Sequence, residues 1–185
     1  MTDLVLLTAL LSGPAYGYAL KRTAGLIFGG GVLHNNLVYP LLKKFVESGW
    51  VEQSSVAGDR GQQRKQYRIT AAGRKHLLEQ IAIFGEREAA DDRAFLFRVA
   101  MFDLLPEEKR AAILAARKAH LTTRVEELAE LSRTGHARSF PALVLKRYQA
   151  LVNDELQWIA KLERPKRRER HANGRVRTRI QHTYA

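Results

Sequence analysis

The sequence contains no cysteine, which excludes disulfide bonds and thiolate metal sites. Long apolar runs are also missing: the stretches Leu4–Leu11 and Ala142–Leu145 fall far short of the about 20 residues that a membrane-spanning helix needs. No basic region precedes Leu4, so no signal peptide is expected. No two of the six histidines have the helical spacing of metal ligands, and no Ser-His-Asp set can be proposed from spacing. These absences predict a cytoplasmic protein that is not an enzyme and holds no metal or cofactor.

Positive charge, in contrast, is in excess and unevenly placed. The net charge is +12, of which residues 1–80 carry +5, residues 81–162 only +1, and residues 163–185 carry +6. Such an asymmetry is typical of proteins that bind phosphate-bearing partners, because each neutralised phosphate releases counterions. An acidic membrane surface would suit the same charge, but no basic amphipathic helix with a broad apolar face accompanies it. Charge therefore favours nucleic acid over membrane.

The hydrophobic period predicts a mainly α-helical chain with one β-hairpin. Short helices are expected over 3–12, opened by Asp3 as a cap, over 15–25, and over 37–48, where Asn35 and Asn36 are candidate N-caps and Gly49 closes the helix. Strands follow over 50–56 and 66–70, joined by a basic loop. Thr70 then caps a helix over 71–89, with Leu77, Leu78, Ile81 and Phe84 on its inner face. The remainder reads as helices over 94–102, from about 106 to 132, and 139–162.

Three helices followed by a basic hairpin describe a winged helix-turn-helix. The predicted organisation is a winged helix-turn-helix DNA-binding domain over 1–89, an α-helical dimerisation domain over 90–162, and a basic, disordered tail over 163–185. The tail either adds nonspecific DNA affinity or is simply solvated.

Five segments resemble the PadR family of bacterial transcriptional regulators. Residues 13–18 (GPAYGY) resemble the turn into the family's second helix, residues 37–44 (LVYPLLKK) its recognition helix, and residues 47–51 (ESGWV) the exit into the wing. Residues 64–74 (RKQYRITAAGR) are similar to the wing strand and the helix after it, and residues 155–159 (ELQWI) to the last helix of the C-terminal domain. The match is dense from about residue 4 to 80 and loose afterwards.

This resemblance implies a homodimer that binds double-stranded DNA at an inverted repeat, usually as a repressor, with a small molecule as a candidate effector. The implied DNA-binding residues lie at the start of the second helix, on the recognition helix and in the wing: Tyr18, Asn35, Asn36, Tyr39, Lys43, Lys44, Arg60, Arg64 and Lys65. Because Lys43 and Lys44 point to adjacent faces, only one of them is expected to touch DNA.

Two of these residues have competing interpretations. The family usually has a small residue and Thr before the tyrosine, whereas this chain has Asn36 and Leu37, so the operator sequence cannot be carried over. Asn36 either reads an adenine edge or serves only as a helix cap. Tyr39 either donates its hydroxyl to a phosphate or packs into the domain with the hydroxyl at its rim.

The C-terminal helices carry apolar stripes too wide to be buried within one small chain, which predicts pairing with a second copy. The predicted dimerisation residues are Leu114, Leu121, Val125, Leu128, Tyr148, Val152, Leu156 and Trp158. Trp158 either lines a pocket between subunits or simply packs in their interface.

Two other functions compete with regulation. One is a protein-interaction module that kept the winged-helix fold and lost its DNA, which the basic wing argues against. The other is a nonspecific RNA- or nucleoid-binding protein driven by the tail. The sequence names neither the operator, nor the regulated genes, nor an effector.

Overall fold

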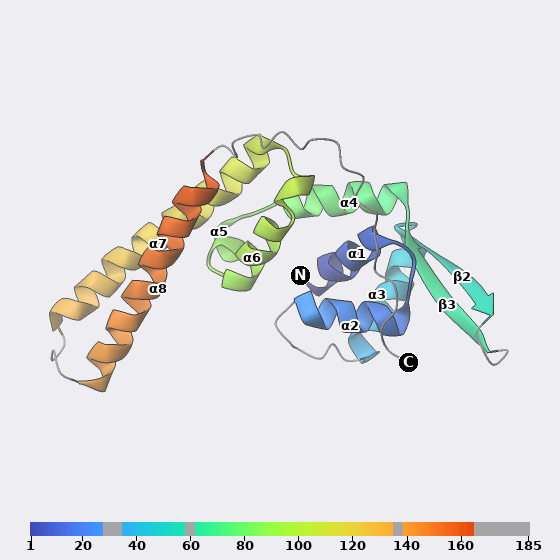
Figure 1. Cartoon of the computed structure of the whole chain (residues 1–185), viewed down its shortest axis with the longest axis horizontal. Coiled ribbons are helices and arrows are strands. Elements are labelled where there is room, and N and C mark those ends of the chain that lie inside the picture. Colours follow the sequence, from blue (N-terminus) through green and yellow to red (C-terminus); the bar gives the residue numbers. More distant parts are fainter. Residues whose placement is uncertain (28–34, 58–61, 135–138, 165–185) are drawn as a thin grey trace, which may run out of the picture.

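The fold is described from a computed structural model, which covers residues 1–27, 35–57, 62–134 and 139–164. The winged helix comprises α1 (Thr2–Ala9), the 3-10 turn η1 (Leu10–Ser12), β1 (Ala15–Tyr16), α2 (Gly17–Ile27), α3 (Asn35–Glu47), β2 (Val51–Ala57), β3 (Gln63–Ile69) and α4 (Ala71–Ala82). It is followed by α5 (Glu86–Ala89), α6 (Asp92–Ala100), the 3-10 turn η2 (Phe102–Leu104), α7 (Glu107–Thr134) and α8 (Phe140–Leu162). Figure 1 shows the hairpin β2–β3 at one end of the molecule and the paired helices α7 and α8 at the other.

The N-terminal half is a winged helix-turn-helix, as the sequence predicted. Its three-stranded antiparallel sheet has the order β1-β3-β2. The central strand is therefore β3, with the short β1 on one edge and β2 on the other. Ala15 and Tyr16 lie opposite Tyr67 and Gln66, which ties the entrance of α2 to the wing. The whole of β2 pairs with β3, from Val51 opposite Ile69 to Ala57 opposite Gln63.

Local signals at both ends of the hairpin are confirmed. Gly49 has a φ of 70°, a left-handed conformation that glycine adopts without strain, and α3 ends just before it. The amide of Trp50 then donates to the carbonyl of Phe45 at 2.9 Å, which satisfies one of the last helix carbonyls. At the start of α4, the hydroxyl of Thr70 accepts the amide of Gly73 at 3.0 Å, as expected of an N-cap.

Three predictions about the helices before the C-terminal unit are wrong. Asp3 does not cap α1 but lies inside its first turn, where it forms an ion pair with the amino group of Met1 at 3.1 Å. The helix after the wing ends at Ala82 rather than 89, because Ile83 takes an extended ψ of 118°. The chain restarts at α5, with Gly85 as its N-cap. Leu78 is exposed rather than inward, although its neighbour Leu77 is fully buried.

One buried apolar cluster runs through the whole described chain. It includes Leu77 and Ile81 of α4, Phe95 of α6, Ile113 of α7 and Ile159 of α8. No boundary interrupts this cluster near residue 89, so the division of the chain into 1–89 and 90–162 stays a prediction. In the described part of the chain, no helix is long and apolar enough to cross a membrane.

A buried arginine joins the C-terminal helices. Arg117 of α7 is 1% exposed and donates to both carboxylate oxygens of Glu155 on α8, at 2.8 and 2.9 Å. It also donates to Asp92 at the start of α6 and to the carbonyl of Ala89. Burial acts to lower the pKa of this guanidinium, but the carboxylates of Glu155 and Asp92 raise it above its ordinary value. The group therefore stays charged while it fixes α6 and α8 against α7.

Most of the predicted dimerisation residues pack within the chain, and their part in a dimer stays a prediction. Leu114, Leu121 and Leu128 are buried within the chain, where α7 packs against α8, α5 and α6. The four half-buried residues are Val125, Val152, Leu156 and Trp158. Trp158 meets the ring of Phe95 edge-on, with 5.9 Å between centroids, inside the same chain. Of the predicted set, only Tyr148 is largely exposed, at 53%.

Candidate nucleic-acid interface

The helix α3 has one buried and one exposed face. Val38, Leu42 and Phe45 are fully buried and anchor it to the core of the winged helix. Because a helix advances 3.6 residues per turn, the intervening positions point outward. These outward residues are Asn36, Leu37, Tyr39, Pro40, Lys43 and Lys44. The face carries an amide, a phenol and two ammonium groups, all of which can bind phosphates or base edges.

Asn35 and Asn36 lie in the first turn of α3 instead of preceding it, so the prediction that they cap the helix is wrong. Pro40 lies inside this helix and has no N–H to donate to the carbonyl of Asn36, four residues earlier. The carbonyl of Asn36 therefore lacks its usual helix donor, and the side chain of Asn36 is exposed beside it.

Tyr39 packs against the start of α2. A Cβ built on Gly17 would lie 2.9 Å from Cε1 of Tyr39 and 3.5 Å from its hydroxyl oxygen. One side of the ring is thus covered by the backbone at Gly17, while 47% of the residue remains exposed. Burial raises the pKa of Tyr67 on β3, and Tyr39 acts in the same direction through its charge. Tyr39 thus both packs against the domain and remains about half exposed to solvent.

The contact at Gly17 brings two predicted residues together. Tyr18 follows directly on α2 and is 73% exposed, so two tyrosines from two helices share this part of the surface. Because β1 ends at Tyr16 and pairs with Gln66, the same point is joined to the wing strand that carries Arg64 and Lys65.

Arg64 and Lys65 lie within β3, not in the loop where the sequence placed them. Arg64 lies opposite Val56 and Lys65 lies opposite Ser55. The side chains of Arg64 and Lys65 are both exposed. The longer strand is explained by pairing: every residue from Gln63 onward finds a partner on β2, which a short apolar run alone does not reveal. Arg60 lies outside the described residues.

Three further cations belong to the same surface elements and were not predicted. Lys21 and Arg22 lie three and four residues after Tyr18 on α2, and so share its helix face. Arg68 is exposed on β3. The helical spacing from Tyr18 was the signal that could have identified the first two.

The cations of this surface are mostly without acidic partners. Lys43 lies 3.7 Å from Glu47, one turn later on α3, and both side chains are well exposed. Among the described residues, no ion pair engages Lys44, Arg64 or Lys65. No cluster of metal-ligating side chains is found in the described ranges.

Residues 6–79 match the family model of the transcriptional regulator PadR-like family. The winged-helix domain of this chain belongs to that family. The match covers the segments 13–18, 37–44, 47–51 and 64–74 of the resemblance, whereas the fifth segment, 155–159, lies outside it. The family is one of transcriptional regulators, not of enzymes.

Solved structures similar to this PadR-like chain include three that span different shares of it. A protein assigned as a transcriptional regulator from Thermoplasma acidophilum is 28% identical, covers 55% of this chain and 86% of its own, and has a TM-score of 0.41. PadR of Bacillus subtilis in complex with operator DNA is 15% identical over 87% of this chain and 95% of its own, with a TM-score of 0.44. The same protein in complex with p-coumaric acid is 15% identical over 87% of this chain and 95% of its own, with a TM-score of 0.39. No curated protein matches the sequence.

Proposed function

We propose that the protein is a dimeric, sequence-specific DNA-binding transcriptional regulator that acts as a repressor in the cytoplasm. The observation that carries the proposal is the exposed surface formed by α2, α3 and β3, where two tyrosines adjoin cations without acidic partners. A surface of this composition is suited to the phosphate backbone, which supplies most of the affinity for DNA. The family to which the winged-helix domain belongs supports the same function.

In helix-turn-helix docking, the N-terminal end of the recognition helix contacts base edges in the major groove. Asn36 lies at that end of α3, and its amide has the donor and acceptor needed to read an adenine. We assign backbone contacts to Tyr18, Tyr39 and Lys44. Arg64 and Lys65 on the wing would contact phosphates or the minor groove beside the site.

The proposed dimer uses the exposed apolar face of α8 rather than the stripe of α7. The exposed large residues on α8 follow helical steps of three, one, four and three residues: Phe140, Leu143, Val144, Tyr148 and Leu151. Phe140, at 84% exposed, and Leu131 at the end of α7 extend the same face to the tip of the helix pair. A patch this apolar at the end remote from the wing suits a two-fold contact with another copy (Figure 1). Two DNA-binding surfaces would then address two half-sites.

The proposal is tested by selecting bound fragments from the host genome and then measuring affinity for the selected duplex at several salt concentrations. We expect one inverted-repeat motif, and a binding constant that falls steeply and linearly with salt on logarithmic axes. Fragments without a shared motif would contradict sequence-specific regulation.

A protein-interaction module would bind no duplex at any salt concentration. A nonspecific binder driven by residues 163–185 would lose all binding when they are deleted, whereas the proposed regulator would lose only part of its affinity. A matched variant keeps residues 163–185 and has Arg64 and Lys65 replaced by alanine. Comparing the two variants separates the contribution of the tail to DNA affinity from that of the wing.

A further inference from the structure

Gly17 is the first residue of α2, at a position where the backbone does not require glycine. Among the described glycines, a positive φ, which favours glycine over other residues, occurs only at Gly13 and Gly49. Helices in general favour alanine over glycine, because glycine loses more conformational freedom when the helix forms. The absence of a side chain at residue 17 therefore has a cause outside its own backbone.

That cause lies on α3. The three atoms nearest to a Cβ built on Gly17 all belong to Tyr39: Cε1 at 2.9 Å, Cζ at 3.5 Å and the hydroxyl oxygen at 3.5 Å. The first of these distances is too short for two carbon atoms, whose optimal separation is about 3.5–4.0 Å. The ring of Tyr39 thus rests in space that any other residue at position 17 would fill.

The ring is the part of this contact that can move. On α3, Val38 and Leu42 are fully buried, so the backbone that carries Tyr39 is anchored in the core. On α2, Leu20 is buried in the same core and anchors the helix that begins at Gly17. Tyr39 itself is about half exposed, so its side chain has open space to turn into. A methyl group at residue 17 would therefore turn the ring rather than shift either helix.

The place of the ring decides what its hydroxyl can bind. A turned ring moves the hydroxyl by several ångströms, because side chains occupy discrete staggered rotamers. A hydrogen bond from a hydroxyl to a phosphate oxygen requires about 2.5–3.0 Å between the two oxygens, so a displacement of this size breaks it. One residue before Gly17, Tyr16 pairs with Gln66 of β3, which fixes the start of α2 relative to the wing. The ring of Tyr39 is therefore held at a set separation from the cations of β3, as the regular spacing of phosphates along DNA demands.

We propose that Gly17 is a positioning residue for DNA binding: it leaves the space in which the ring of Tyr39 rests, and so holds the hydroxyl where it meets a phosphate. The inference rests on the proposed function and on the assignment of Tyr39 to a backbone contact. Gly17 itself does not touch the DNA, and its whole effect on affinity passes through the ring.

A double-mutant cycle tests whether Gly17 acts through Tyr39. Affinity for the selected operator is measured by fluorescence anisotropy for the wild type, Gly17→Ala, Tyr39→Ala and the double variant. Gly17→Ala alone should weaken binding about tenfold, the usual effect of losing one hydrogen bond to a charged group. When residue 39 is already alanine, the same substitution should change the affinity by less than about twofold. An equal loss in both backgrounds, or no loss when the tyrosine is present, overturns the inference.

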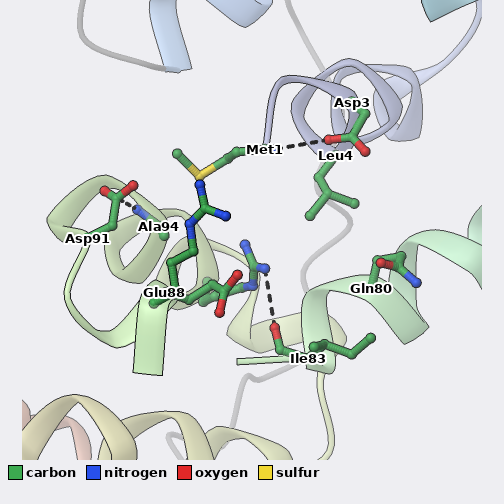
Figure 2. A pocket seen from close by; sticks show the side chains of 10 residues that line it. Met1, Asp3, Leu4, Gln80, Ile83, Glu88, Asp91 and Ala94 are labelled. Atoms are coloured by element: carbon green, nitrogen blue, oxygen red, sulfur yellow. Dashed lines mark hydrogen bonds and ion pairs between the residues drawn. The ribbon is translucent and has the colours of Figure 1, made fainter. Parts of the chain in front are cut away.

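Gly85→Ala is the matched control for the cycle. Its methyl group would meet only Glu88, on the wall of a cavity that none of the residues assigned to DNA lines (Figure 2). The control should bind the operator as the wild type does. A tenfold loss in Gly85→Ala as well would show that the effect of an added methyl group is not particular to Gly17, and would overturn the inference.

The pattern across operator sequences gives a second readout. Gly17→Ala should weaken binding to every single-base variant of the operator to the same extent, as Tyr39→Phe should, because a phosphate contact carries no base information. A loss confined to particular bases would contradict a route through the hydroxyl of Tyr39.

Two measurements without DNA distinguish a turned ring from a disturbed fold. The urea midpoint of Gly17→Ala should be no lower than that of the wild type, because residue 17 has no positive φ and the ring can yield. In protein labelled with fluorotyrosine, the fluorine resonance of Tyr39, identified by its loss in Tyr39→Phe, should shift in Gly17→Ala. The resonance of Tyr148, on α8, should stay in place. A lower midpoint, or an unchanged Tyr39 resonance, overturns the inference.

The failure of this inference differs from the failure of the proposed function. A wild type that binds no duplex refutes both. A wild type that binds its operator, together with a Gly17→Ala variant that binds equally well, refutes only the role of Gly17.

Discussion

Gly73 at the start of α4 lies against the backbone of Trp50, so closely that a Cβ on residue 73 would overlap the carbonyl oxygen of Trp50. The same carbonyl accepts the amide of Thr70 at 3.0 Å. The first turn of α4 is therefore docked directly on the junction between α3 and the wing. Only glycine permits this approach, and the docking determines how the wing stands relative to α3.

Gly73→Ala should destabilise the protein by about 3 kcal/mol, because backbone atoms must move to admit the methyl group. The sign is diagnostic, since alanine in place of glycine inside a helix normally stabilises by about 0.5–1 kcal/mol. Gly85→Ala is the matched control: its Cβ would meet only Glu88 Oε2, at 3.4 Å, an ordinary contact. Urea unfolding of both variants checks the prediction, and equal midpoints would contradict it.

Arg117→Met should destabilise the protein by about 3 kcal/mol or more. The substitution leaves the carboxylate of Glu155, whose side chain is 24% exposed, without the cation that binds it through two bonds. Arg124→Met on the same helix removes an exposed pair with Glu127 and should cost less than about 1 kcal/mol. Thermal unfolding distinguishes them. A similar loss in both variants would mean that the buried network contributes no more than a surface pair.

The proposed dimer makes the third prediction. Val144→Glu together with Tyr148→Glu should weaken self-association about 100-fold or more, because a two-fold contact would bring four carboxylates into an apolar interface. Leu96→Glu places one such charge on an equally exposed apolar residue of α6 and should leave the dimer intact. Light scattering over a concentration series gives the result. A wild-type chain that is monomeric at micromolar concentration would refute the dimer itself.

The sequence predicted those elements whose signals are local. Gly49 ends α3 and Thr70 caps α4 through nearby backbone groups. The helix predicted to start at residue 139 is opened in the same way, since Ser139 accepts the amide of Ala142 at 3.3 Å as the cap of α8. Such contacts depend on neighbouring residues alone, so pattern and position suffice to identify them.

The sequence did not reveal contacts that depend on distant partners. Arg117 reads as one more cation on a helix, yet its acceptors lie 25, 28 and 38 positions away along the chain. Leu114, Leu121 and Leu128 form a regular stripe whether the helix that covers them is α8 or one from a second copy. Periodicity shows that one face of a helix is buried, but it does not show which element packs against that face. The same holds for Tyr39, whose packing on Gly17 follows from the way α2 and α3 cross.

The wing provides the fourth prediction. Arg64→Ala with Lys65→Ala should weaken binding to every duplex and reduce the slope of log affinity against log salt by about one for each phosphate that the wing no longer neutralises. Lys109→Ala with Lys161→Ala removes the same charge from exposed positions of α7 and α8 and should change the slope far less. Unchanged affinity and slope in the first variant would show that the wing does not touch DNA.

The recognition helix gives the last prediction, which separates base contacts from backbone contacts. Asn36→Ala should relax base preference at one position in each half-site, because a bidentate contact discriminates against a wrong base by about 1–3 kcal/mol. Tyr39→Phe keeps the ring that packs on Gly17 and removes only the hydroxyl. It should weaken all sequences alike, since a phosphate contact carries no base information.

Binding of both variants to a panel of single-base operator changes distinguishes these effects. Uniform loss for Asn36→Ala would reduce that residue to a structural role in the first turn of α3, and unchanged affinity for Tyr39→Phe would confine the tyrosine to packing. In the selected operator, half-site centres should lie about 34–36 Å apart or a multiple of that distance, because two copies related by a two-fold axis must meet the same face of the DNA. A site without two-fold symmetry would contradict the dimeric mechanism even if both substitutions behave as expected.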